Sequence, residues 1–253
     1  MNETKTSGAP AKLGATSRTD AWWVEPALVA TGFTLFIIYA TWRALFDYQY
    51  QEWGPYLSPF FSPKITLPGW QWSPAILILW MPAGFRATCY YYRKAYYRAY
   101  FMDPPACSVG HFGGEKYCGE TSFPLVLQNL HRYFLYLAIL VVAFLWWDAF
   151  KAFEYNGQLR VGVGTLVLLG NSLFLSFYTF GCHAFRHLVG GRLDCFSCSS
   201  GAKTQFKLWN AVTKLNEHHM LWAWVSLFTV AFADFYVRQL AAGVWTDIPL
   251  IGS

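Results

Sequence analysis

Five long apolar runs constrain this chain more than any other feature of its sequence. Hydrophobic residues make up 55% of its 253 residues and charged residues only 13%, whereas soluble domains are about 25% charged. A helix that crosses a bilayer needs about 20 apolar residues, and each run has that length. We therefore expect an all-α, polytopic membrane protein whose five transmembrane helices form a bundle. The expected spans are residues 24–46, 73–92, 123–150, 161–189 and 218–240.

The basic residues orient these spans. If the N-terminus lies inside, the inner tail and loops hold most of the 19 Lys and Arg residues. Because cytoplasmic loops carry the excess of positive charge, we expect a multi-pass protein of the inner (plasma) membrane with its N-terminus in the cytoplasm and its C-terminus outside. The polar residues 1–20 lack the apolar core of a signal peptide and predict a flexible tail before a membrane domain over residues 21–253. The loops explain the net charge of +5, so nucleic acid is not an expected partner.

The fourth run ends in GCHAFRH, residues 181–187, where a thiol, two imidazoles and a guanidinium meet the edge of the membrane. Such groups are costly inside a bilayer and mark functional sites by default. Counting residues at about 1.5 Å rise each brings thiols and imidazoles of other spans to the same inner boundary. This layer comprises Cys89, His131, Cys182, His183 and His219. His218 and His219 are adjacent, so only one can face the bundle well, and the sequence leaves that choice open.

The donor types of this layer suit a metal centre. Two thiolates and several imidazoles can hold a metal ion or an iron–sulfur cluster, and a Cys2His2 set is the Rieske pattern. The competing interpretation is that each cysteine is a small buried hydrophobe and each histidine a hydrogen-bonded filler. In the loops, Cys195-x2-Cys198 is favoured as a pair of ordinary loop cysteines, and the alternative is half of a zinc knuckle that Cys107 and Cys118 could complete.

Two charged positions stand apart from the layer. Arg86 lies about one turn deeper than Cys89, and a charge at that depth should face a cavity, a cofactor or a polar ligand. The alternative is an arginine that snorkels to the interface. Near the outer edge, Asp234 and Arg238 are spaced i, i+4 and are expected to form an ordinary interfacial ion pair.

Several strings at these positions are long and specific. They are TCYYYRKAYYR (88–98), PPAC (104–107), GET (119–121), LQNLHRYF (127–134), the CH and RH pairs between 182 and 187, and KLN (214–216). In these strings the chain resembles the cytochrome b-like membrane anchor of actinobacterial succinate dehydrogenase, the type F class of respiratory complex II. The resemblance covers roughly residues 73–240, and the tail and first span share less of it.

This resemblance implies an anchor for a flavoprotein subunit and an iron–sulfur subunit, on which succinate is oxidised, so no catalytic residue for that oxidation is expected here. Electrons would pass through a membrane-embedded Rieske-type [2Fe–2S] cluster to a quinone, with menaquinone as the expected type. Cys89 and Cys182 are then the thiolate ligands. His131 and His183 are the favoured imidazole ligands, with His219 close behind. Contact with membrane lipid and a homo-oligomeric assembly of the complex are further expectations.

Quinone reduction needs groups that bind a quinone carbonyl and relay protons, and Arg86, His187 and Tyr133 are the candidates. Two rival functions stay open. A haem b cytochrome would use His131 with His183 or His219 as axial ligands. A non-redox transporter or scaffold would place Arg86 in a substrate path, and the inverted half-repeats that favour a transporter are not visible in the sequence.

Overall fold

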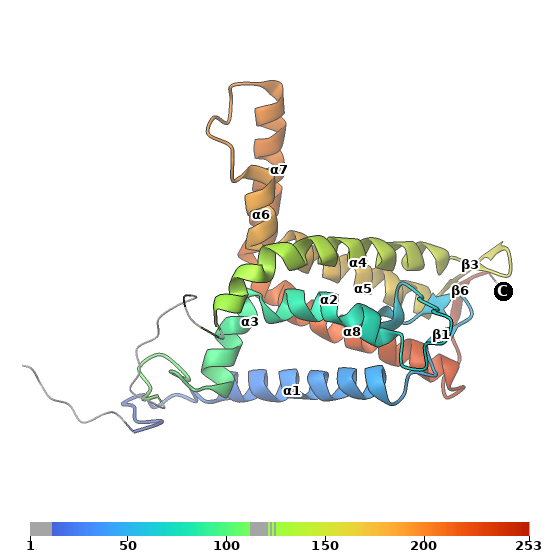
Figure 1. Ribbon diagram of the computed structural model, residues 1–253, viewed down its shortest axis with the longest axis horizontal. Helices are drawn as coiled ribbons and strands as arrows, with labels where there is room; N and C mark the ends of the chain where they lie inside the picture. The colour runs from blue at the N-terminus through green and yellow to red at the C-terminus, as the bar shows by residue number, and fades with distance from the viewer. Residues whose placement is uncertain (1–11, 112–120, 122, 124, 253) are drawn as a thin grey trace, which may run out of the picture. The chain divides into compact units, whose positions relative to one another are not determined.

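The computed structural model describes residues 12–111, 121, 123 and 125–252 (Figure 1). The start of the expected flexible tail, residues 1–11, and the loop residue Cys118 lie outside the described residues. The chain forms two compact units, one from residues up to 35 and 87–129, the other from 36–86 and from 130 onward. Helix α1, Val24–Leu45, begins in the smaller unit and ends in the larger one.

The smaller unit is built on the aromatic and basic segment after Cys89. Helix α3, Tyr90–Ala95, continues into the π-helical turn η2, Tyr96–Tyr100. The ring of Phe33 on α1 lies 5.3 Å from that of Tyr92 and 5.9 Å from that of Tyr96. Residues 12–20 run beside the loop that follows η2, with Gly14 N bonded to Gly110 O at 3.0 Å and the Thr16 hydroxyl bonded to Ser108 O at 2.7 Å.

The larger unit contains the remaining long helices. Helix α5 packs against both α4 and α8. Small residues permit this close approach, because Ala149 of α4 and Ala233 of α8 lie fully buried in one core cluster with Leu168 of α5. The helices are α2 (Ala75–Ala87), α4 (His131–Lys151), α5 (Val163–Phe180), α6 (His183–Gly190), α7 (Ser200–Glu217) and α8 (His219–Ala241), and the turn η4 (Leu125–Leu130) leads into α4.

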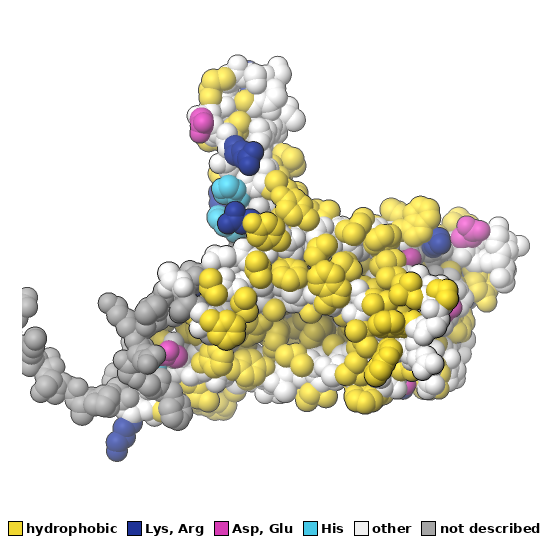
Figure 2. Space-filling view, viewed as in Figure 1, with side chains coloured by type: hydrophobic (Ala, Val, Ile, Leu, Met, Phe, Trp, Pro, Cys, Tyr) yellow, Lys and Arg dark blue, Asp and Glu magenta, His cyan; other side chains and the backbone are white. Residues whose placement is uncertain are grey.

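Four helices in the described residues are long and apolar enough to cross a membrane: 24–45, 125–151, 163–180 and 219–241. Large apolar side chains such as Leu140, Trp147 and Phe228 are exposed on them, and Figure 2 shows hydrophobic side chains over much of the visible face of these helices. In a bilayer such a surface contacts lipid. The predicted all-α membrane protein is therefore confirmed, whereas the fifth span and the orientation of the termini stay predictions.

Two expected spans are interrupted at a cysteine. The predicted helix 73–92 ends at Ala87, after 13 residues, and Cys89 is extended (φ −66°, ψ 130°) before α3 begins. The predicted helix 161–189 ends at Phe180, and Cys182 is likewise extended (φ −74°, ψ 152°) before α6. A Cβ at Gly181 would lie 2.5 Å from Phe177 O and 3.2 Å from Leu215 O, so the second break requires glycine. Continuous helices through these cysteines were a wrong expectation.

Three short antiparallel strand pairs, two of them hairpins, lie in the larger unit near the end of α4 and the start of α5. Beneath them, Asp247 accepts hydrogen bonds from the hydroxyls of Tyr56 (2.8 Å) and Tyr236 (2.9 Å) and from Gly164 N (2.9 Å). Burial raises the pKa of Tyr56, so its hydroxyl stays a donor. The strands are β1 (Glu52–Trp53) with β2 (Tyr56–Leu57), β3 (Glu154–Tyr155) with β4 (Gln158–Leu159), and β5 (Val161–Gly162) with β6 (Pro249–Ile251), and the short turn η1 (Pro59–Phe61) follows β2.

A buried ion-pair network joins α1 to α8 in the same unit. Arg43 and Asp234 are both 0% exposed, and the guanidinium donates to the two carboxylate oxygens from Nε at 2.8 Å and Nη2 at 3.0 Å. Tyr39 and Ser58 donate to the same carboxylate, and Arg238 pairs with Asp47. The predicted pair between Asp234 and Arg238 is therefore wrong, because each of them is bonded to a residue of α1 or the turn after it.

Helices α6 and α7 pack against each other as a hairpin that projects away from α4 and α5 (Figure 1). Arg186 of the GCHAFRH string holds the hairpin together, since its Nε donates to the Thr213 hydroxyl at 3.0 Å and its guanidinium lies 4.3 Å from the centre of the Trp209 ring. In the connecting loop Cys195 and Cys198 form a disulfide. Neither cysteine is therefore a free thiol in this structure, whereas the alternative of half a zinc knuckle needs both thiols free.

Candidate functional site

Inside the larger unit, four side-chain rings contact one another in a row, and two of the predicted histidines lie at its two ends. His131, the first residue of α4, stacks on Phe85 with ring centres 4.5 Å apart. His219, the first residue of α8, stacks on Tyr178 at 5.0 Å. Phe85 and Tyr178 themselves meet edge to face at 5.4 Å. Residues from α2, α4, α5 and α8 therefore bring His131 and His219 to one cluster, and His219 rather than the exposed His218 faces the interior.

Arg86 lies beside this ring cluster. Its guanidinium carbon sits 4.6 Å from the centre of the Tyr178 ring, within the range of a cation–π contact. Its two terminal nitrogens donate to Ala223 O at 3.2 Å and to the Ser226 hydroxyl at 2.9 Å, both on α8. With 8% of its surface exposed, Arg86 is a buried cation, as expected, and does not snorkel to the interface.

The two predicted thiol ligands share an unusual backbone position. Cys89 and Cys182 are each the N-cap residue of a helix and are only 2% and 1% exposed. The Cys182 thiol accepts a hydrogen bond from Phe185 N at 3.2 Å. Carboxamide side chains occupy both breaks, because Gln128 donates to Ala87 O at 3.3 Å and Asn216 donates to Gly181 O at 2.8 Å. Gln128 belongs to the LQNL string and Asn216 to the KLN string, so each string contributes a side chain that stabilises the break at one cysteine.

The other predicted residues lie on the surface. His183 and His187 of α6 are exposed, and Tyr133 of α4 is 61% exposed. His183 therefore differs from His131 and His219, which are half-buried. Within the described residues, no three His, Cys, Asp or Glu side chains are gathered closely enough to hold a metal ion. The assignments of all these side chains to a cluster or a quinone stay predictions.

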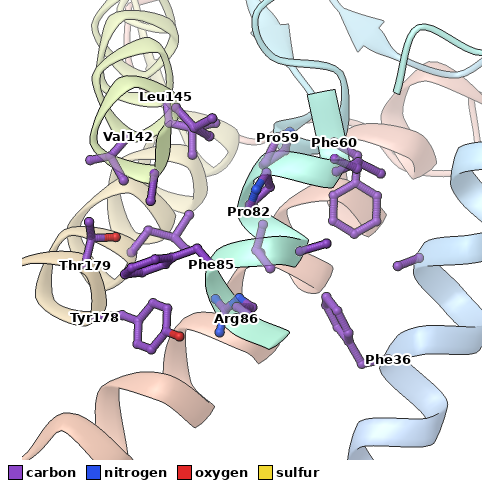
Figure 3. A pocket seen from close by; sticks show the side chains of 17 residues that line it. Phe36, Pro59, Phe60, Pro82, Phe85, Arg86, Val142, Leu145, Tyr178 and Thr179 are labelled. Carbon is purple, nitrogen blue, oxygen red and sulfur yellow. The ribbon is translucent and has the colours of Figure 1, made fainter. Parts of the chain in front are cut away.

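An apolar pocket opens next to Arg86 in the larger unit (Figure 3). Its cavity volume is about 140 Å³. Phe36, Pro59 and Phe60 bound one side, and Tyr178 and Thr179 bound another. Arg86 is the one charged side chain among the 17 described residues that line it. A cavity that is apolar except for one buried cation suits a hydrophobic ligand with a polar group at one end.

Sequence reasoning did not single out Tyr178, Thr179 or Phe85. Tyr178 is fully buried between Arg86 and His219. A signal for it was present, because Tyr178 is the one tyrosine in the apolar run from Val161 to Phe180 and lies four residues before Cys182. Phe85 carried no such signal, since phenylalanine is common in apolar helices.

The fold and these side chains define a polytopic helical membrane protein with thiols and imidazoles at helix starts. Its sequence matches the family model of actinobacterial succinate dehydrogenase subunit SdhC over residues 24–243, and the chain belongs to that family. It is therefore a membrane anchor subunit of succinate dehydrogenase, whose succinate chemistry lies on other subunits.

The chain is also similar to a solved structure, the Mycobacterium smegmatis Sdh1 complex in the apo form. The identity is 40%, the TM-score is 0.86, and the match covers 99% of this chain and 98% of that chain. No curated protein matches this chain.

Proposed function

We propose that this subunit accepts electrons from the iron–sulfur subunit of its complex and delivers them to a quinone within the membrane. The flavoprotein and iron–sulfur subunits are the partners of an anchor of this family, and the similar solved structure is that of a complex. The observation that supports the proposal most is the ring cluster of His131, Phe85, Tyr178 and His219 beside Arg86 and its apolar pocket.

The donor set fits a Rieske-type [2Fe–2S] cluster, which takes two thiolates and two imidazoles. Cys89 and Cys182 are the thiolates in this proposal, and His131 and His219 become the preferred imidazoles because His183 is exposed. When bound, such a cluster supplies one-electron transfer at a potential raised by its histidine ligands. Cys182 is the N-cap residue of α6 and accepts the Phe185 N–H bond on its sulfur, and the start of a helix favours negative charge such as that of a thiolate.

The ring stacking has a separate role in this proposal. Phe85 and Tyr178 hold the imidazole planes of His131 and His219, since each imidazole lies within 11° of parallel to its neighbour. They also cover one face of each imidazole with a ring that is almost fully buried. Fixed ring planes would orient the nitrogen atoms that bind the metal.

An electron paramagnetic resonance spectrum of the reduced, purified complex tests the cluster directly. A Rieske-type signal is expected, without haem absorbance in the parallel optical spectrum. The specific alternative is a haem b site with His131 and His219 as axial ligands, which the same ring cluster could orient. Haem absorbance without the iron–sulfur signal would establish that alternative and contradict the cluster.

The pocket beside Arg86 is the proposed quinone site. Its apolar lining suits a quinone ring and the start of an isoprenoid tail, and Arg86 can donate a hydrogen bond to a quinone carbonyl. Menaquinone stays the expected quinone. Tyr178 and Thr179 are further hydroxyl-bearing residues at the pocket that could take part in proton transfer. His187 and Tyr133 do not line this pocket.

Replacing Arg86 by glutamine should lower kcat/KM for quinone about 10- to 100-fold, because a hydrogen bond from a charged group contributes about 1.5–3 kcal/mol. Dye-linked succinate oxidation and the cluster signal should be unchanged. Ser226→Ala is the matched control, since it removes a partner of Arg86 but leaves the cation beside the pocket. If both variants lose quinone activity equally, Arg86 acts through α8 packing and does not bind the quinone.

A further inference from the structure

A second small pocket, in the smaller unit, lies where α1 begins. Lys94 and Arg98 line it from α3 and η2, and Pro26 and Val29 line it from the first turns of α1. The two cations are one helical turn apart, so they flank the same opening. Among the described residues neither of them forms an ion pair with a carboxylate.

The positive charge at this opening is therefore not fully compensated. Arg98 donates to the Tyr97 hydroxyl at 3.4 Å and to the Cys107 sulfur at 3.7 Å, and neither partner is a carboxylate. The Glu25 carboxylate also lies at the rim but is exposed. Two cations against one carboxylate leave a net positive charge that attracts an anion.

The position of the pocket relative to the membrane indicates which class of anion could bind there. Helix α1 is one of the four membrane-spanning candidates, and it starts at Val24, directly after Trp22 and Trp23. Tryptophan side chains at a helix end mark the headgroup level of the bilayer. Further along α1, the side chain of Leu28 is 68% exposed, so an apolar surface for acyl chains continues from the rim.

The size of the pocket is consistent with one compact group. Its cavity volume is about 30 Å³, and a space of about 10–15 Å³ holds a single water molecule. The pocket therefore has room for a single headgroup anion but not for a ring or a tail. We propose that Lys94 and Arg98 bind the phosphate of an anionic phospholipid in the membrane leaflet where α1 begins.

Native mass spectrometry of the purified complex tests this site with dioleoylphosphatidylglycerol as the probe and dioleoylphosphatidylcholine as the neutral comparison. Lys94→Ala/Arg98→Ala should weaken phosphatidylglycerol binding roughly 30-fold, because each basic residue near the surface contributes about 1 kcal/mol. The charge-keeping variant Lys94→Arg/Arg98→Lys should bind within a few-fold of the native complex, which separates lost charge from lost folding. Glu25→Gln should bind the lipid more tightly.

Lys203→Ala/Lys207→Ala is the matched control, since it removes two exposed lysines at the same i, i+4 spacing on α7. Equal losses in the two alanine pairs would overturn the proposal, because the lipid would then respond to overall charge alone. Displacement of the lipid by millimolar inorganic phosphate would also overturn it, because the site would then bind the free anion.

Discussion

Replacing Cys182 by serine is expected to abolish electron transfer to quinone and leave dye-linked succinate oxidation intact. Serine is a good N-cap residue, so its hydroxyl can accept the Phe185 N–H bond that the thiol now accepts. It is a poor substitute for a soft thiolate at iron. Loss of even a supporting residue of a metal site costs 10- to 100-fold, so we expect quinone-coupled turnover to fall by more than about 100-fold.

The readouts are quinone-coupled and dye-coupled succinate oxidation on the same preparation, together with the paramagnetic signal of the reduced complex. Cys107→Ser is the matched control, because it removes an exposed thiol of the other unit. If Cys182 only caps α6, the serine variant should retain full quinone activity, and that result would contradict its role as a ligand.

Neutralising Asp234 with asparagine is expected to destabilise the larger unit by about 3–5 kcal/mol, the usual cost of removing one partner of a buried ion pair. The change leaves the Arg43 guanidinium, which is 0% exposed, without its bidentate carboxylate. It also weakens the bonds from Tyr39 and Ser58 that converge on the same group. The measurement is the free energy of unfolding of the complex in a denaturant titration, with the melting temperature as a second readout.

Glu52→Gln provides the comparison for an exposed ion pair. Glu52 pairs with Lys64, and both side chains are 49% exposed, so its loss should cost no more than about 1 kcal/mol. Arg43→Met/Asp234→Leu should recover part of the loss in Asp234→Asn, because it removes both buried charges. An Asp234→Asn variant as stable as Glu52→Gln would show that the network contributes little.

Much of the candidate site could be predicted from the sequence because polar groups are rare in apolar runs. Arg86, His131 and His219 stood out for that reason, and the structure places all three in or beside one cluster of rings. His183 and His187 stood out equally, yet they are exposed. Their i, i+4 spacing showed that they share a helix face, but it could not show whether that face is buried.

The helix breaks at Cys89 and Cys182 show why the lengths of two transmembrane helices are overestimated from the sequence. Hydropathy continues through both positions, so a count of apolar residues predicts unbroken helices. The break at Cys182 involves a group distant in sequence, because the Asn216 carboxamide donates to Gly181 O. The carbonyl of Phe177, four residues earlier, leaves no room for a Cβ at Gly181. Likewise, Asp234 pairs with Arg43, 191 residues away, and not with its helical neighbour Arg238.

The sequence by itself determined that this is a helical membrane protein, the family to which it belongs, and which thiols and imidazoles could serve a redox centre. Composition and short strings suffice for these conclusions because none of them depends on contacts between residues that lie far apart in the chain. The tertiary structure decided which histidines face the interior, where the helices break and which charges pair. Those outcomes depend on contacts between residues far apart in the chain, and only the packed fold brings such residues together.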